Sequence, residues 1–463
     1  MDIFELRSKY QRFNYNSYSI SEDNEKIYID FEFEIEGLKV FKPRTEILKK
    51  DFKWKDINAN DIKNIVFYLG LVEAISYYKP VCCPTFVIKC GKIDEKQEKW
   101  FSDLFYFGLG EFRYVNNIKI DQEEFIRFES QGDFIDISEV SSSNNSGLIV
   151  PIGGGKDSVV TISLLKKFKD EILPISIGAK QVVVDCIETA GYERKDLIEI
   201  NRVIDKGLIE LNNEGYFNGH TPFSAIVAFM TYLVATLLGK KYIPLSNEDS
   251  ANQSNVDGEK INHQYSKTIE FEENFRNFAK EYLREDVEYF SFLRPITEIQ
   301  IAYLFSREKE FYKVFKSCNV GSKQTPWVWC CDCPKCMFVY TIMAPFIKRD
   351  ELIDIFGEDL FAKESLEKTF VELCGYGDLK PFECVGTFEE VRFAVTKTIK
   401  QYEEEGRELP YLLKLYKSRY EESKDEFLKY YNNKNFLPEE FDKILRERIL
   451  ENDWGKVIRI FKR

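Results

Sequence analysis

The sequence predicts an α/β protein whose centre is a doubly wound parallel sheet, preceded by an α+β region and followed by a helical region. From residue 147 onward, short apolar segments of strand length alternate with segments that have helical spacing of apolar residues. This alternation is typical of βαβ units and parallel sheets. A chain of 463 residues exceeds one ordinary core, so we expect three domains, at 1–145, 146–346 and 347–463.

The N-terminal region is expected to contain a hairpin and two helices. Apolar and polar residues alternate from Lys26 to Glu34, which predicts a half-buried strand, and Leu38 to Phe41 is its expected partner. Helices are predicted over Asp61 to Tyr78 and Lys96 to Leu109. A polar linker rich in Ser and Asn is predicted from Ser138 to Gly147.

The central region is expected to supply the parallel strands. A strand over Leu148 to Ile152 precedes a predicted helix over Ser158 to Phe168. The uncharged segment from Thr221 to Gly239 is long enough for a thin bilayer, but its Pro222 and the strand directly after it favour a helix buried against the sheet. Further strands are predicted at 172–177, 208–211 and 242–245, with another crossover opening within 185–191.

The C-terminal region is predicted to be helical and strongly charged. Thr387-Phe-Glu-Glu390 has the spacing of a capping box before a helix over Val391 to Tyr402. Alternating charges in this region describe solvated helix faces.

Composition excludes several classes of function. The net charge is −13 and no basic segment stands out, which argues against a nucleic-acid partner. The N-terminal residues lack an apolar signal core, so we expect a cytoplasmic protein without a membrane span. Oligomeric state is not predicted.

A glycine-rich loop follows the first predicted central strand. Gly153, Gly154 and Gly155 let backbone N–H groups approach an anion, and the helix that begins near them adds unpaired donors and a positive dipole end. Lys156, Asp157 and Ser158 follow directly. This arrangement suits phosphate or pyrophosphate, although neither the Walker spacing nor the dinucleotide-loop spacing is present.

Polar residues gather in three further turns. The chain has two histidines, His220 and His263, each in a turn that suits either proton transfer or a structural hydrogen bond. Glu248 and Asp249 follow a predicted strand, where they could hold Mg²⁺ or cap the next element.

Cysteines cluster in one part of the chain. Five of the eleven lie between Cys318 and Cys336, and the absence of a secretory signal argues against disulfides. The spacing of four suits tetrahedral Zn²⁺, while buried free thiols are the alternative. The four expected zinc ligands are Cys318, Cys330, Cys333 and Cys336.

Two motifs of the sequence resemble motifs of a known group of enzymes. The glycine loop with Lys156, Asp157 and Ser158 resembles the PP-loop of ATP pyrophosphatases, Ser-Gly-Gly-x-Asp-Ser, with Gly153 at the place of the usual serine. The Cys-x-x-Cys-x-x-Cys run also resembles the zinc site of the deazaguanine-forming branch of these enzymes. The resemblance implies a PP-loop domain that cleaves ATP to AMP and pyrophosphate.

Several stretches together resemble the UDP-N-acetylmuramoyl-L-alanyl-L-glutamate epimerases, the MurL family. They are Gly108-Leu-Gly-Glu-Phe112, Pro151 to Ser158, Asn218-Gly-His220, Ser246-Asn-Glu-Asp-Ser250, Asn262-His-Gln-Tyr-Ser-Lys267, Cys333-Pro-Lys-Cys336 and Lys380-Pro-Phe-Glu-Cys-Val-Gly-Thr387. The resemblance covers most of the chain.

This resemblance implies ATP- and Mg²⁺-dependent inversion of the terminal L-Glu of a UDP-linked peptidoglycan precursor through an acyl-adenylate. The glycine loop, Lys156 and Ser158 are then expected at the phosphates, Asp157 at Mg²⁺ or in an orienting role, and Asp249 as a further Mg²⁺ ligand. His263 is the first choice for base or acid, His220 or Glu248 its expected partner, and Lys267 is expected to neutralise a substrate carboxylate or phosphate. The residues expected to bind the substrate are Asn262, Lys380, Glu383 and Thr387.

Two other functions compete with the epimerase. The cysteine spacing favours another PP-loop enzyme, such as a deazaguanine-type synthase, and a tRNA-modifying ligase belongs to the same group. A non-enzymatic nucleotide-binding module is the last alternative, and the intact Lys156, Asp157 and Ser158 argue against it.

Overall fold

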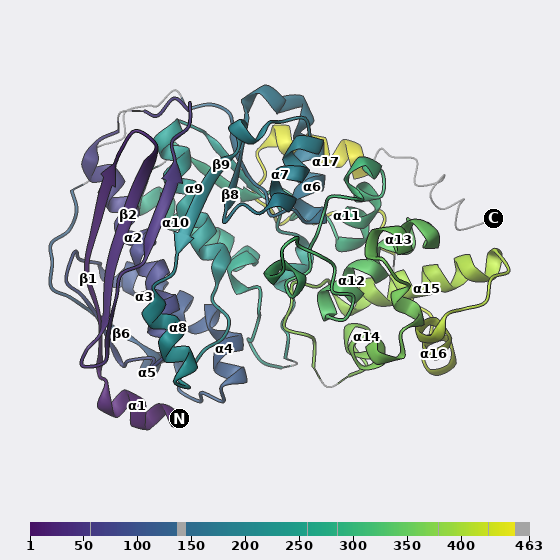
Figure 1. The fold of residues 1–463 in the computed structure, drawn as a ribbon, viewed down its shortest axis with the longest axis horizontal. Coiled ribbons are helices and arrows are strands. Elements are labelled where there is room, and N and C mark those ends of the chain that lie inside the picture. The colour runs from purple at the N-terminus through teal and green to yellow at the C-terminus, as the bar shows by residue number, and fades with distance from the viewer. Residues whose placement is uncertain are drawn as a thin grey trace.

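A single large sheet flanked by helices, with a helical region at one side, forms the protein in the computed structural model (Figure 1). The structure describes residues 1–55, 57–136, 145–256, 258–284, 286–377, 379–424 and 426–449. Most of the predicted linker at 138–147 lies outside the described residues, as does the end of the predicted helical region.

The central strands form the predicted parallel sheet, in the order β11-β10-β7-β8-β9. After β7 the chain adds β8 and β9 on one side, then returns to add β10 and β11 on the other. This reversal is the doubly wound pattern, and it places a switch point between the carboxyl ends of β7 and β10. The strands are β7 (Leu148–Pro151), β8 (Ile172–Ile177), β9 (Ile198–Val203), β10 (Tyr242–Leu245) and β11 (Glu288–Ser291).

The N-terminal strands extend the same sheet, because β4 pairs antiparallel with β9. The predicted hairpin is confirmed by the antiparallel pairing of β2 with β3. One 11-stranded sheet therefore crosses the predicted division at residue 145. Its other members are β1 (Arg12–Glu22), β2 (Lys26–Ile35), β3 (Lys39–Phe41), β4 (Arg44–Leu48), β5 (Thr85–Ile88) and β6 (Arg127–Ser130).

Two hydrophobic cores lie on the two faces of the sheet. Alternate residues of β7 divide between them: Ile149 packs into one core, and Leu148 and Val150 into the other. The first core contains α2 (Ala59–Tyr78), α9 (Phe223–Leu238) and α10 (Ile269–Tyr282). The second contains α6 (Lys156–Leu164), α7 (Gln181–Thr189) and α11 (Glu298–Phe305).

The predicted strand at 208–211 is wrong. These residues belong to α8 (Lys206–Asn213), in which Leu208 and Leu211 are buried three residues apart on one helix face. A segment of four residues, three of them apolar, is too short for its periodicity to separate a strand from a helix. The long apolar segment is the buried helix α9, and within the described residues no helix has the length and apolarity to cross a membrane.

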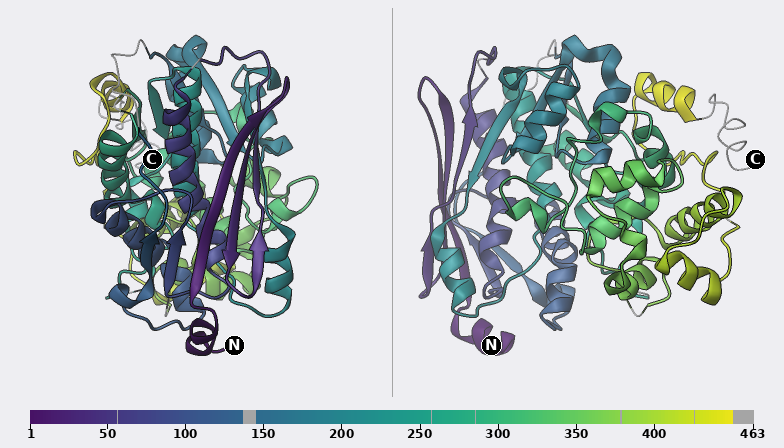
Figure 2. Two further views of the ribbon diagram at one scale, coloured as in Figure 1. Left: turned by 90° about the vertical axis from the view of Figure 1, so that its left-hand side faces the viewer. Right: turned by 45° about the vertical axis from the view of Figure 1, so that its right-hand side comes forward.

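The C-terminal region is helical (Figure 2), and α17 packs against the sheet. Phe441 of α17 packs against Tyr242 and Phe290 of the neighbouring strands β10 and β11. The predicted capping box is confirmed, since Thr387 and Glu390 cap α15 reciprocally. The helices here are α12 (Pro334–Met343), α13 (Arg349–Phe356), α14 (Glu367–Leu373), α15 (Phe388–Glu404), α16 (Tyr411–Arg419) and α17 (Glu439–Ile449). Those near the N-terminus are α1 (Ile3–Lys9), α3 (Glu95–Gly108), α4 (Gly110–Val115) and α5 (Gln122–Phe125).

Candidate active site

The glycine loop, Gly153 to Gly155, lies at the switch point. The helix α6 that follows the loop is joined to the segment after β10 by a hydrogen bond of 2.9 Å between the hydroxyls of Thr161 and Ser246. Gly154 has φ +83°, and a Cβ there would lie 2.3 Å from Val182 Cγ1. The backbone can therefore pass this point only as glycine.

The loop leads into α6 with its backbone donors uncapped. Gly155 is the N-cap of α6 and offers no side chain, so the first N–H groups of the helix have no side-chain cap. The Ser158 hydroxyl donates back to the Gly155 carbonyl at 3.0 Å. Gly153 has free space around its Cβ position, so the serine of the usual PP-loop would fit there.

Lys156 is fully buried between two carboxylates. Its Nζ donates to Asp157 Oδ1 at 2.5 Å and to Glu298 Oε2. Burial lowers the pKa of Lys156, but the two carboxylates outweigh burial and raise it. Burial also raises the pKa of Glu298 to about 8, despite the nearby lysine. Lys156 is thus buried in contact with two acidic side chains, of which Asp157 follows the glycine loop directly.

The two histidines meet in one cluster with Glu111. Their ring centroids are 4.3 Å apart. Glu111 Oε2 bonds to His263 Nδ1 and lies 3.6 Å from His220 Nδ1. Burial and the charge of His263 lower the pKa of His220 to about 3. Burial also acts against the charged form of His263, but its contacts with Cys384 and Glu111 raise that pKa to about 9.

Two glycines allow Glu111 to reach both histidine turns. A Cβ on Gly108 would lie 2.9 Å from Pro222 Cγ, and Gly110 packs on the backbone of Ile261. Helix α3 ends at Gly108, and α4 begins at Gly110 with Glu111 in its first turn. The end of the helix predicted over Lys96 to Leu109 is thus the point where the N-terminal region contacts the site.

Lys267 and Lys335 converge on Cys384. Lys267 Nζ donates to Cys384 Sγ at 3.3 Å, and Lys335 Nζ donates to the Cys384 carbonyl. Burial alone would raise the pKa of the Cys384 thiol, but Lys267 and His263 lower it to about 6. Lys335 and Lys267 also stabilise the charged form of Asp157, so the same two lysines act on Cys384 and on the carboxylate that follows the glycine loop.

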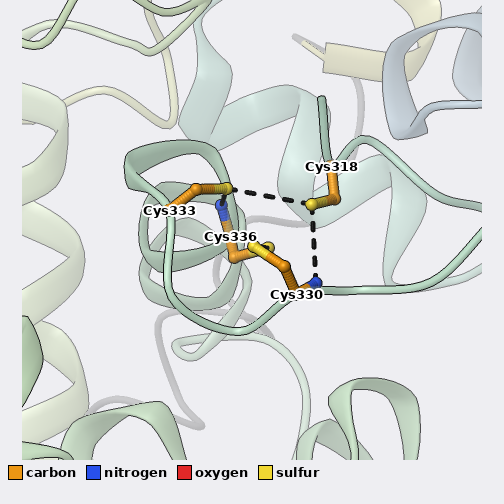
Figure 3. Close-up of side chains that lie close together, drawn as sticks. All are labelled: Cys318, Cys330, Cys333 and Cys336. Carbon is orange, nitrogen blue, oxygen red and sulfur yellow. Dashed lines mark hydrogen bonds between the residues drawn. The ribbon is translucent and has the colours of Figure 1, made fainter. Parts of the chain in front are cut away.

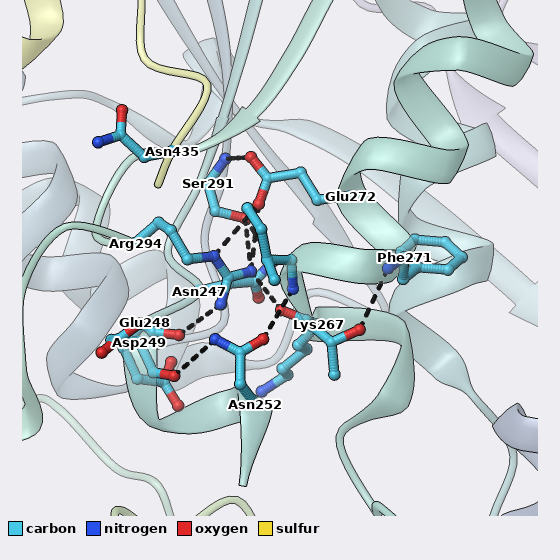
Figure 4. A network of polar contacts seen from close by, with 12 residues as sticks. Asn247, Glu248, Asp249, Asn252, Lys267, Phe271, Glu272, Ser291, Arg294 and Asn435 are labelled. Atoms are coloured by element: carbon cyan, nitrogen blue, oxygen red, sulfur yellow. Dashed lines mark hydrogen bonds and ion pairs between the residues drawn. The ribbon is translucent and has the colours of Figure 1, made fainter. Parts of the chain in front are cut away.

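A buried arginine holds two site segments in place (Figure 4). Arg294 is fully buried and pairs with Glu272 at 3.1 Å. It also donates to the backbone carbonyls of Glu248 and Lys267. The segment after β10 and the segment that carries Lys267 are therefore joined through one guanidinium.

Other predicted residues make structural contacts. Both Asp249 oxygens accept hydrogen bonds from C-terminal residues, at 2.7 Å each from Tyr430 and Asn432. Asn262 bonds to nearby backbone groups, the Ala251 carbonyl and the Gln264 N–H.

The turn 380–387 is similarly engaged. Lys380 Nζ donates to Gln253 Oε1 at 2.8 Å, and burial lowers its pKa to about 8. Glu383 accepts a hydrogen bond from Asn319, and the Thr387 hydroxyl caps α15.

Glu248, the other predicted catalytic carboxylate, is buried, with Ser250 Oγ 3.4 Å from its carboxylate.

The four predicted cysteine ligands come together (Figure 3). Their sulfur atoms all lie within 4.8 Å of one another, with Cys318–Cys333 and Cys330–Cys336 both at 3.8 Å. The fifth cysteine, Cys331, instead donates to the Phe356 carbonyl. The cluster adjoins the glycine loop, because Lys316 N–H donates to the Gly154 carbonyl at 2.9 Å.

Sequence reasoning missed four residues of the site: Glu111, Glu298, Lys335 and Cys384. Three of them lie within stretches that carry the family resemblance, around Gly108, Cys333 and Lys380. Glu298 has no such signal, because it is the first residue of an apolar helix.

The fold and the site define an α/β enzyme whose buried carboxylates, lysines and imidazoles gather at the switch point of a parallel sheet. The family model of the MurL N-terminal domain matches residues 5–292, and that of the MurL C-terminal domain matches residues 314–427. The chain belongs to the MurL family.

Curated relatives agree with this assignment. UDP-N-acetyl-alpha-D-muramoyl-L-alanyl-L-glutamate epimerase of Xanthomonas oryzae pv. oryzae is 32% identical over 348 residues, covering 73% of this chain and 75% of the relative. The enzyme of that name from a Micromonospora species is 32% identical over 352 residues, covering 75% and 77%. No solved structure matches the chain.

Proposed function

We propose that this protein inverts the terminal L-Glu of UDP-N-acetylmuramoyl-L-Ala-L-Glu to D-Glu, in an ATP-dependent reaction that supplies peptidoglycan synthesis. The observation that carries the proposal is the cluster of His220, His263 and Glu111, whose neighbour Lys267 also acts on Asp157 at the glycine loop. Membership of the MurL family and the names of the curated relatives support it.

The glycine loop and the start of α6 are the proposed site of the ATP phosphates, as in a PP-loop. Uncapped backbone donors and a helix dipole favour a bound anion there. Asp157, with Glu298 beside it, offers the oxygen ligands that Mg²⁺ prefers. Bound Mg²⁺ would neutralise phosphate charge, and Lys156 would exchange one carboxylate partner for a phosphate.

Adenylation of the substrate prepares the proton chemistry. A free carboxylate makes the neighbouring Cα proton hard to remove, because the product would be a dianion. Transfer of AMP to the α-carboxylate removes that charge and releases pyrophosphate. One group then takes the Cα proton and another returns one to the opposite face, after which water cleaves the adenylate.

The imidazole pair suits acid and base roles. Near pH 7 His263 is protonated and His220 is neutral, since their pKa values are moved to about 9 and about 3. Two neighbouring groups with separated pKa values are typical of an acid and base pair. His263 is thus the proposed proton donor in the resting state, with His220 or Glu248 as its partner.

Basic residues near the pair are the proposed contacts of the anionic substrate. Lys267 lies against Cys384, and Lys380 is buried beside Gln253. We place the substrate carboxylates at Lys267, and the UDP-linked part at the turn 380–387 and the N-terminal region.

The cysteine cluster is proposed to hold a structural Zn²⁺. A tetrahedron of four sulfur atoms with Zn–S bonds of about 2.3 Å has edges of roughly 3.8 Å. Two of the sulfur pairs have this separation, and the remaining ones fall within 4.8 Å. The ion would fix the segment 316–318 against the glycine loop.

One assay tests the function. The protein is incubated in D₂O with ATP, Mg²⁺ and UDP-N-acetylmuramoyl-L-Ala-L-Glu, and the nucleotides and glutamate are analysed. We expect AMP, pyrophosphate, D-Glu and deuterium at Cα. Formation of ADP and phosphate would refute the PP-loop mechanism.

The alternative is another PP-loop enzyme, such as a deazaguanine-type synthase or a tRNA-modifying ligase, which the cysteine cluster favours. Turnover to AMP that requires a different acceptor, with no inversion of glutamate, would establish that alternative instead.

A further inference from the structure

Cys384 is a polarised thiol within the histidine cluster. Its sulfur accepts a hydrogen bond from Lys267 at 3.3 Å, and its carbonyl accepts one from Lys335. On its other side is His263, which in turn bonds to Glu111. Thiol, imidazole and carboxylate thus form a chain, in which the third group orients the second.

This thiol differs from the other cysteines of the described residues. The buried sulfur atoms of Cys82, Cys83, Cys186 and Cys374 have raised pKa values, because burial disfavours the thiolate. Among the described cysteines, Cys384 alone accepts a hydrogen bond at sulfur from a lysine ammonium group. Reactive cysteines are found in such electropositive, partly exposed surroundings.

We propose that Cys384 is a catalytic residue that exchanges the Cα proton on one face of the glutamyl residue, while His263 exchanges it on the other. This inference rests on the proposed epimerase function and identifies the partner of His263. The thiol contacts His263 and Lys267, and Lys267 also acts on Asp157 at the proposed adenylation site.

The proton and electron balance is complete without another reagent. The Cys384 thiolate takes the Cα proton and becomes a thiol, and the C–H electron pair moves onto the carbonyl of the acyl-adenylate. The protonated His263 then donates a proton to the opposite face of Cα, and the electron pair returns to form the new C–H bond. In the reverse direction, neutral His263 removes the proton and the thiol donates one.

Acid–base strength favours Cys384 over His220 as this partner. A general base works best when its pKa lies near the working pH. The pKa of His220 is lowered to about 3, so it accepts a proton poorly, whereas that of Cys384 is about 6. Near pH 7 the resting site therefore holds a thiolate beside an imidazolium, which are a base and an acid ready at the same time.

The test follows each epimer separately in D₂O. Cys384→Ala and Cys384→Ser are compared with wild type, starting from the L-Glu and from the D-Glu form of the substrate. Substrate-dependent exchange of labelled pyrophosphate into ATP reports adenylation and folding. Cys90→Ala is the matched control, because Cys90 is also half-buried but its thiol pKa is raised to about 12.

We expect both Cys384 variants to keep pyrophosphate exchange within about threefold of wild type and to lose inversion by roughly 10² to 10⁴. Deuterium should still enter Cα from one epimer, through His263, and not from the other. Inversion within threefold of wild type would overturn the proposal. So would an equal loss of deuterium exchange from both epimers, which a merely structural role predicts.

The wild-type result distinguishes a failure of the proposed epimerase function from a failure of the proposed role of Cys384. Absence of AMP and D-Glu from the wild-type protein refutes the epimerase function, and the role of Cys384 with it. Wild-type turnover combined with symmetric exchange in Cys384→Ala refutes only the role of Cys384.

Discussion

The imidazole rings of His220 and His263 lie 4.3 Å apart, and their surroundings move their pKa values in opposite directions. Glu111 causes part of this difference, because its bond to His263 raises the pKa of that imidazole, whereas burial and the charge of His263 lower the pKa of His220. Two like residues in one cluster are thereby prepared for different protonation states. This relationship underlies the first two predictions.

Replacement of the two histidines should have unequal effects. His263→Asn removes the proposed proton donor, and we expect a loss of inversion of roughly 10² to 10⁴ with adenylation retained. His220→Asn should lower inversion far less, because His220 is neutral in the resting state. Parallel measurement of D-Glu formation and pyrophosphate exchange checks this, and equal losses in both variants would contradict it.

The pH dependence of inversion should be bell-shaped, with limbs near 6 and 9. The active state holds one proton on the Cys384–His263 pair, so activity falls below the pKa of Cys384 and above that of His263. Lys267, Lys335, Glu111 and His220 face this pair. Profiles of kcat/KM from pH 5 to 10 measure the limbs, and a flat profile across this range contradicts the assignment.

Glu111→Gln should move the alkaline limb to lower pH. The carboxylate of Glu111 raises the pKa of His263, so its removal lets the imidazolium lose its proton earlier. The acid limb should move less, because Lys267 acts on Cys384 directly. An unchanged alkaline limb would show that His263 does not determine it.

Gly154→Ala should abolish ATP cleavage and lower Tm. The substitution meets a positive φ and a Cβ contact of 2.3 Å with Val182. Gly357→Ala is the control, since Gly357 has φ +93° but open space around its Cβ position. We expect the control to cost about 1 to 2 kcal/mol of unfolding free energy and to keep activity. Equal behaviour of the two variants would contradict the close packing of the loop.

Zinc content should depend on four of the five clustered cysteines. Cys330→Ser and Cys333→Ser remove a ligand and should lose the metal, whereas Cys331→Ser should retain about one zinc per chain. Metal analysis of protein purified under reducing conditions measures this. Wild-type protein without zinc would show that the cluster consists of free thiols.

Local patterns predicted much of the fold. The predicted strands at 148–152, 172–177 and 242–245, the buried apolar helix and the capping box at Thr387 are present, because each depends on spacing within a short segment. The strands β9 and β11 were not predicted. The predicted strand at 208–211 is wrong, because four residues are too few for their spacing to indicate a strand or a helix. The continuation of the sheet through β4 and β9 has no local signal, because strand pairing is a long-range contact.

By itself, the sequence determined the family, the glycine loop, the two histidine turns and the identity of the four clustered cysteines. Residue type and spacing are enough here, because glycines suit phosphate binding, histidines suit proton transfer and closely spaced cysteines suit a metal. Only the tertiary structure decided that Glu111 joins the histidines, that Lys156 is enclosed by carboxylates, and that Cys384 lies against Lys267. Charge and burial at these groups depend on neighbours from distant parts of the chain, and they decide which group holds a proton.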